Sequence, residues 1–235
     1  MFRFIAMSGC LLLTGCGTIY TQPRPADYLA STNQATDSDT SLFSSDADVL
    51  SDADIARILE YQYTAPPLSR IALLPFGWSA WAGWSEEMAL ATDAIDSQVL
   101  SVLRTSPRIY DASFLPSILV PDQRSVPYLR EAAARYQADL LLVFRSSCRS
   151  FERYRLFQED QTRAFCSVEA VLLDIRTGLV PFVANSTQTF EAAQSESDLN
   201  FRETIMRSQL DSIATALGEI SAAVVQFMEQ SRDGA

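Results

Sequence analysis

The sequence predicts an α/β domain, a sandwich of the order β-α-β-α-β-β-β-α with helices packed on a mixed sheet, preceded by a disordered tether. Three observations lead to this prediction. Short apolar runs such as residues 70–76 and 140–144 are typical of buried strands. They alternate with segments whose apolar residues recur every three or four positions, as in amphipathic helices. Residues 17–50 are polar, contain prolines and show no period.

Capping residues and prolines bound the first five elements. Ser51, followed by two acidic residues, is a typical N-cap, and Ser125 before Pro127 is another. Pro107 cannot continue the helix that precedes it. In chain order these signals predict a helix over residues 51–62, a strand over 70–76, a helix over 85–105, a strand over 108–113 and a helix over 125–136.

The second half of the chain predicts three consecutive strands and a long helix. A tight turn at Arg176, Thr177 and Gly178, in which glycine supplies a positive φ, separates the last two strands. Asn200, with Glu203 three residues later, resembles a capping box and begins the helix. The predicted strands cover residues 140–155, 162–175 and 180–190, and the predicted helix covers 200–229.

The first residues form a leader. Arg3 is followed by an apolar stretch over residues 4–13, which is about half the roughly 20 residues that a membrane span needs. The leader ends in Leu13-Thr14-Gly15-Cys16, which resembles the bacterial lipobox. The resemblance implies that residues 1–15 are a signal peptide that is removed and that Cys16 is acylated, for example with palmitate. The alternative is a generic signal peptide in which a cysteine falls at this place.

The position after the cysteine bears on localisation. In lipobox proteins of Gram-negative bacteria, Asp after the cysteine usually retains the protein in the inner membrane, and here Gly17 follows. The resemblance therefore implies an outer-membrane lipoprotein, anchored by Cys16 and facing the periplasm. We expect residues 16–50 to be the acylated cysteine and an acidic linker. Residues 51–235 would then be one domain, the leading helix included.

Composition excludes several functions. The formal net charge is -11, which disfavours nucleic acid as a partner because phosphates would be repelled. The chain has no Lys and no His, so it lacks the residues for a Ser-His-Asp site, a Ser-Lys site or an imidazole metal cage. We therefore expect no cofactor, no metal and no enzymatic activity.

The composition does not exclude one class of enzyme, a glycan hydrolase whose catalytic residues are carboxylates alone. Its candidate residues are Glu86, Glu87, Asp93 and Asp96. The alternative for the first two is structural, because acidic residues at a helix start interact favourably with the helix dipole.

Cys148 and Cys166 are the cysteines left once the leader is removed and Cys16 is acylated. In the oxidising periplasm such a pair predicts a disulfide. Placing the two opposite each other fixes a hairpin register that also brings Arg145 opposite Glu169 and pairs two valines. The alternative is two buried, reduced thiols.

Two surface clusters are candidates for partner binding. All three tryptophans, Trp78, Trp81 and Trp84, directly follow the first strand, where they would form a docking platform or pack inward on the helix-sheet junction. An arginine stripe on the odd-numbered face of the hairpin is the second cluster, and its alternative is a solvated sheet face. The stripe contains Arg145, Arg149, Arg153 and Arg155, with Arg163 nearby.

The last predicted helix carries apolar residues in steps of four and three, from Met206 to Phe227. Such a seam is expected to pack along the chain's own sheet. The alternative is that part of it meets a neighbouring subunit, giving a homo-oligomer through residues 201–229.

The order of the predicted elements, together with four short segments, resembles that of a known group of envelope proteins. The segments RIALLPF, RIYDAS, AARYQADLLLVF and LLDIRTGLV together are similar to a group that contains the CsgG secretion lipoprotein, the amino-terminal domain of TolB and the LpoB activator. The resemblance implies a non-catalytic envelope lipoprotein that binds a periplasmic protein or cell-wall glycan, as an accessory subunit of a cell-wall or export assembly. An alternative within the group is a ring-forming secretion component of the CsgG type.

Overall fold

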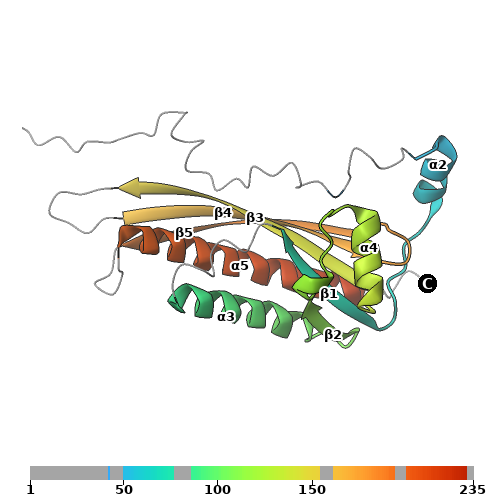
Figure 1. Ribbon diagram of the computed structural model, residues 1–235, viewed down its shortest axis with the longest axis horizontal. Coiled ribbons are helices and arrows are strands. Elements are labelled where there is room, and N and C mark those ends of the chain that lie inside the picture. Colours follow the sequence, from blue (N-terminus) through green and yellow to red (C-terminus); the bar gives the residue numbers. More distant parts are fainter. Residues whose placement is uncertain (1–41, 43–49, 77–85, 154–160, 194–199, 232–235) are drawn as a thin grey trace, which may run out of the picture.

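The computed structural model describes residue 42 and residues 50–76, 86–153, 161–193 and 200–231 (Figure 1). In these ranges it confirms the predicted α/β class and order of elements, with boundaries shifted by a few residues. The elements are α2 (Asp52–Glu60), β1 (Ser69–Phe76), α3 (Glu86–Leu103), β2 (Ile109–Phe114), the 3-10 helix η3 (Ser117–Leu119), α4 (Val126–Arg135), β3 (Leu140–Arg153), β4 (Gln161–Asp174), β5 (Phe182–Ala193) and α5 (Phe201–Gln230).

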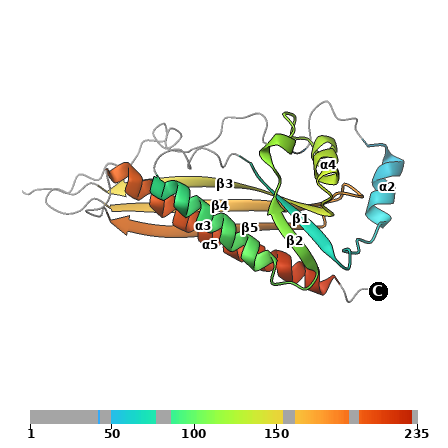
Figure 2. The same ribbon diagram turned by 60° about the horizontal axis from the view of Figure 1, so that its bottom comes forward.

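The strands form one mixed sheet in the order β2-β1-β3-β4-β5. β1 is parallel to β2 and to β3, whereas β3, β4 and β5 are antiparallel to their neighbours. The last pair between β1 and β3 joins Phe76 to Arg145, and β3 continues beside β4 to Arg153. Figure 2 shows the three long strands running well past β1 and β2. The sheet is therefore broad at one end and a three-stranded ribbon at the other.

The two faces of the sheet are covered differently. Helices α3 and α5 lie on one side, where Leu140, Leu142 and Phe144 of β3 join the larger apolar core (Figure 1). On the other side α4 covers a smaller core that includes Leu141 and Val143. This alternation is the two-residue period of a strand with both faces buried. α4 packs only at the broad end, and among the residues that the structure describes no other helix lies on this side of the ribbon (Figure 2).

The apolar seam of α5 packs on the chain's own sheet, as expected. Met206, Leu210, Ile213 and Val224 are among its buried residues and belong to the larger core. By length and composition alone α5 is also long enough and apolar enough to cross a membrane. Its burial against β4 and β5 identifies it as a core helix instead. An oligomer through residues 201–229 would thus have to use faces of α5 other than this seam.

The leading helix α2 is capped as predicted but packs little. The side chain of Ser51 accepts a hydrogen bond from the backbone N–H of Asp54. The apolar stripe of α2 faces solvent: Ile55, Ile58 and Leu59 are all exposed, and no residue of the helix is buried. The first firm contacts of this segment come after the helix, where Ala65 is buried in the core.

The turn between β4 and β5 is the predicted one. Gly178 has a φ of +79°, a left-handed conformation that favours glycine. Its N–H donates to the carbonyl of Asp174 at 2.8 Å. The guanidinium of Arg130, from α4, donates to the carbonyls of Ile175 and Arg176 at 2.9 and 2.7 Å. The turn is therefore attached to the helix that covers this end of the sheet.

Candidate functional site

The hairpin register is the one that the cysteines and charges predicted. Val143 pairs with Val171, Arg145 with Glu169, and Cys148 with Cys166. A disulfide joins the two cysteines, whose Cα atoms are 4.2 Å apart. Both cysteines are buried in the core between the ribbon and α5. The covalent link therefore holds β3 and β4 together where the sheet has narrowed to three strands.

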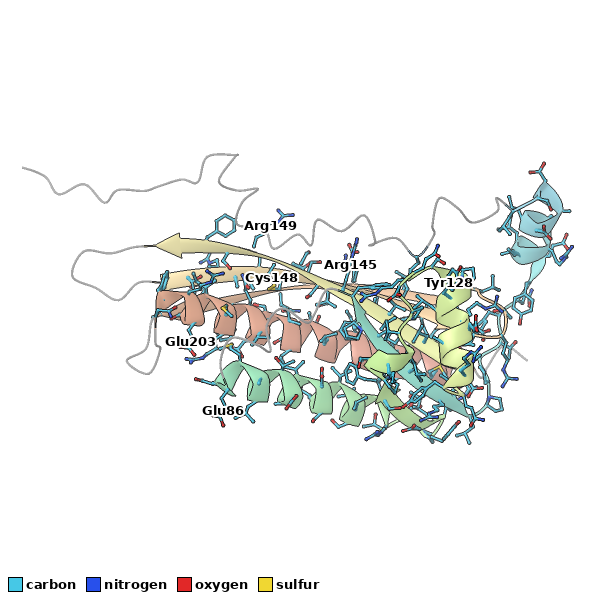
Figure 3. All side chains as sticks on the ribbon, in the orientation of Figure 1. Glu86, Tyr128, Arg145, Cys148, Arg149 and Glu203 are labelled. Carbon is cyan, nitrogen blue, oxygen red and sulfur yellow. A yellow bond between two sulfur atoms is a disulfide. The ribbon has the colours of Figure 1, made fainter. Side chains whose placement is uncertain are left out.

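Beyond Val143, the odd-numbered side chains of β3 leave the cover of α4 and become exposed. Figure 3 shows Arg145 and Arg149 on one side of β3 and Cys148 on the side of α5. The surface continues across both neighbouring strands, because opposed residues in an antiparallel sheet share a face. We call it the open hairpin face and define it by Arg145, Ser147, Arg149, Phe151, Arg163, Phe165, Ser167, Glu169, Asn185, Thr187, Thr189 and Glu191.

Ion pairs and hydroxyl groups make up the polar part of this face. A guanidinium nitrogen of Arg145 lies 2.8 Å from the carboxylate of Glu169. One residue pair further on, the hydroxyl of Thr187 donates to Ser167 at 3.1 Å, and Ser167 donates to the side-chain oxygen of Asn185 at 3.0 Å. These groups form a row of hydrogen-bonding partners across all three strands. Such a row is suited to contacts with another polar surface.

Two phenylalanines give the face an apolar centre. Phe151 and Phe165 are half-buried and meet edge to face, with ring centroids 5.4 Å apart. Each lies opposite an arginine in the register, Phe151 opposite Arg163 and Phe165 opposite Arg149. Arg163 in turn forms an ion pair with Glu191. Aromatic residues and arginine are each enriched where proteins bind one another.

The open hairpin face has a small positive net charge, whereas the whole chain is negatively charged. It carries three arginines, Arg145, Arg149 and Arg163, and two glutamates, Glu169 and Glu191. The whole chain, by contrast, has a formal net charge of -11. A basic excess on an acidic protein favours approach of a negatively charged partner.

Several predicted site residues lie outside the described ranges. These are Cys16 with the leader and most of the linker, the three tryptophans Trp78, Trp81 and Trp84, and Arg155. The backbone of Arg153 ends β3, but its side chain is outside the description. Of the arginines predicted to bind a partner, the structure thus places the side chain of Arg149 on the open hairpin face.

The carboxylates proposed for glycan hydrolysis lie along α3. Glu86, Glu87 and Asp93 are exposed, and Glu87 forms an ion pair with Arg207 of α5 at 2.9 Å. Burial, together with the charge of Asp93, raises the pKa of Asp96 to about 6. Within the described residues, the shallow depression between α3 and α5 is lined by one carboxylate, that of Asp211, and by none of these four.

No group of histidine, cysteine or acidic residues suited to hold a metal ion occurs within the described residues. The expectation that the chain needs neither metal nor cofactor stays a prediction.

Phe151, Phe165 and the row formed by Ser167, Asn185 and Thr187 were not among the residues predicted from the sequence. The signal was present, because the register that pairs Cys148 with Cys166 also places Phe165 opposite Arg149. Extending the odd-numbered face from β3 to β4 and β5 would have found these residues.

No protein-family model matches the chain, and no curated protein matches it. Solved structures that resemble it include a PelC dodecamer from Paraburkholderia phytofirmans, at 18% identity and a TM-score of 0.36, covering 68% of this chain and 91% of that one. Lipoprotein GNA1162 from Neisseria meningitidis matches at 14% identity and a TM-score of 0.32, covering 70% and 99%. A minor lipoprotein from Acinetobacter baumannii matches at 9% identity and a TM-score of 0.34, covering 71% and 96%.

These identities and TM-scores are too low to assign a function or an assembly. The resemblance to the group of CsgG, TolB and LpoB stays a prediction.

Proposed function

We propose that this protein is a non-catalytic bacterial lipoprotein of the outer membrane. Acylated Cys16 would hold it to the membrane, and its domain would bind a partner in the periplasm. The lipobox-like leader supports the anchor, because several acyl chains on one cysteine give stable attachment. The absence of His and Lys from the sequence supports a binding role over most enzymatic ones.

The observation that carries the binding role is the open hairpin face. One side of the β3-β4-β5 ribbon is sealed by α5, and the opposite side presents arginines around the Phe151–Phe165 pair. Aromatic residues and arginine are both enriched at surfaces that bind other proteins. We infer that the partner is a periplasmic protein with an acidic patch.

A protein fits this surface better than a glycan does. The face is spread over three strands of the sheet. A broad sheet surface of this kind suits protein docking, whereas small ligands such as single sugars usually bind in enclosed pockets. Glycan binding is the outcome that would replace this proposal. The role that follows is an accessory subunit of a cell-wall or export assembly. The alternative of a ring-forming component stays a prediction, and such a ring would have to use faces of α5 other than the seam, which packs within the chain.

Charge reversal at Arg149 tests the proposal. The tagged full-length protein is cross-linked in the cells that produce it, and captured proteins are identified by mass spectrometry. Arg149→Glu is expected to lower capture of the partner at least about tenfold, as for a charge inside an interface. Arg57→Glu, on the exposed helix α2, is the matched control and should leave capture unchanged. Equal capture by both variants, or capture of glycan only, would overturn the proposal.

A further inference from the structure

β5 forms one free edge of the sheet. It is the last strand in the order β2-β1-β3-β4-β5, and its twelve residues pair with β4 in one uninterrupted register. Among the residues that the structure describes, backbone hydrogen bonds join this strand to β4 and to no other segment. Its outward N–H and C=O groups therefore present a regular template on which another strand can pair.

Natural edge strands are usually protected, and β5 lacks the usual protections. It has no proline, no lysine, no arginine and no bulge, and it is longer than an average strand. Val183 and Phe190, near its two ends and on opposite faces, are exposed at 65% and 39%. A strand added along this edge would cover both side chains as well as the backbone groups.

Acidic side chains determine what kind of strand fits. Glu219 of α5 is exposed beside this edge, where it accepts a hydrogen bond from the Ser186 hydroxyl at 2.6 Å. Glu191, the one charged residue of β5 itself, lies on the opposite face and forms an ion pair with Arg163, so Glu219 is the carboxylate that an added strand would meet. A second copy of β5 brings no basic residue to Glu219. A strand that carries arginine or lysine would complement it.

We propose that the outer edge of β5 binds an extended, basic segment of another protein by strand addition. Main-chain hydrogen bonds supply the affinity in this mode, and alternate side chains supply the specificity. A basic side chain of the added strand faces Glu219 on the α5 side. β5 also contributes residues to the open hairpin face, but Glu219 lies on the opposite, α5 side of the ribbon and Arg149 lies on β3. The experiments for the two proposals therefore use different residues, and failure of one is distinguishable from failure of the other.

A defined peptide serves as the probe. A ten-residue synthetic peptide of alternating threonine and arginine is added to the full-length protein, and binding is measured by fluorescence anisotropy. Amide hydrogen exchange then locates the contact. We expect binding, with slowed exchange in residues 182–193, because the outward N–H groups of β5 become hydrogen-bonded.

Two controls separate strand addition from simple charge attraction. The same peptide with every backbone nitrogen methylated keeps its side-chain charges but has no N–H to donate to the ladder, and it should not bind. Glu219→Lys should weaken the arginine peptide about tenfold, whereas Glu229→Lys, on the same helix and exposed, should not change its affinity. Equal binding of the N-methylated peptide, protection outside β5, or β5 protection that depends on protein concentration without peptide would each overturn the inference.

Discussion

Cys148 of β3 and Cys166 of β4 are direct cross-strand partners, and their disulfide lies immediately beneath the open hairpin face. Their side chains point to α5, while the flanking residues Arg149 and Phe165 point to solvent or lie half-buried on the opposite side. The bond therefore fixes the register of the surface that we propose as the binding site. A slip by one residue would exchange the two faces of the ribbon.

Removing the disulfide is expected to destabilise the domain. Because the bond closes a loop between residues 18 positions apart, the double variant Cys148→Ala, Cys166→Ala should lose about 3 kcal/mol of unfolding free energy. Urea unfolding of the oxidised protein and the variant measures this difference. The wild-type protein in reductant is the control and should approach the variant. Thiol labelling of both cysteines in the native, unreduced protein would contradict the prediction.

Two glycines are predicted to respond to alanine in opposite directions. Gly178 has a φ of +79°, and an added Cβ would lie 3.2 Å from the Arg130 guanidinium, so Gly178→Ala should cost about 1 to 2 kcal/mol. Gly218 is in the middle of α5, where the nearest atom to an added Cβ is 3.9 Å away on Gln98. Gly218→Ala should therefore stabilise by up to about 1 kcal/mol. Thermal unfolding of the pair tests this, and a shift of the same sign in both would refute it.

Asp96 gives the stability of the domain a specific pH dependence. Burial and the charge of Asp93 raise its pKa from 3.8 to about 6. The folded state thus binds this proton more tightly than the unfolded state, and that contribution to stability is lost as the pH rises from about 4 through 6. After allowance for solvent screening, Asp96→Asn should stabilise by about 1 kcal/mol at pH 7 and have little effect at pH 4.

Urea midpoints at pH 4 and pH 7 measure this effect. Asp122→Asn, in an exposed loop, is the control and should show no such difference between the two pH values. A stabilisation by Asp96→Asn that is equal at both pH values would show that charge burial is not its cause.

The anchor is tested by comparing two cysteines of the leader region. Cys16→Ser should abolish acylation and move the protein from the membrane to the soluble periplasmic fraction, because a protein without acyl chains has no stable attachment. Cys10→Ser should change neither, since Cys10 lies within residues 1–15, which we predict to be removed. Labelling with a palmitate analogue and cell fractionation provide the readout. Membrane attachment of the Cys16→Ser protein would rule out this anchor.

The sequence was sufficient to predict the local elements and the pairing of β3 with β4. The side chain of the capping residue Asn200 accepts a hydrogen bond from the Glu203 N–H at 3.2 Å. Such caps involve residues only a few positions apart, so a short stretch of sequence is enough to predict them. The pairs Cys148–Cys166 and Arg145–Glu169 both require the same register between the two strands, so together they predict it.

Other features depend on tertiary packing, which no single segment encodes. The apolar stripe of α2 is readable, but nothing in it shows that Ile55, Ile58 and Leu59 stay exposed. Likewise, the extent of the open hairpin face depends on where α4 ends over the sheet. The arginine stripe was predicted, whereas the phenylalanine pair beside it depends on combining two strands. The tryptophan platform lies outside the described residues and stays a prediction.

The central claim is that a partner docks on the open hairpin face. Its most direct test is site-specific photo-crosslinking in cells, with the reactive amino acid at Ser147 in the middle of this face and, for comparison, at the exposed position Leu90 on α3. We predict a distinct protein adduct from position 147 that is absent from position 90 and disappears when Arg149→Glu is introduced. Adducts from position 90 but not from position 147 would contradict the claim.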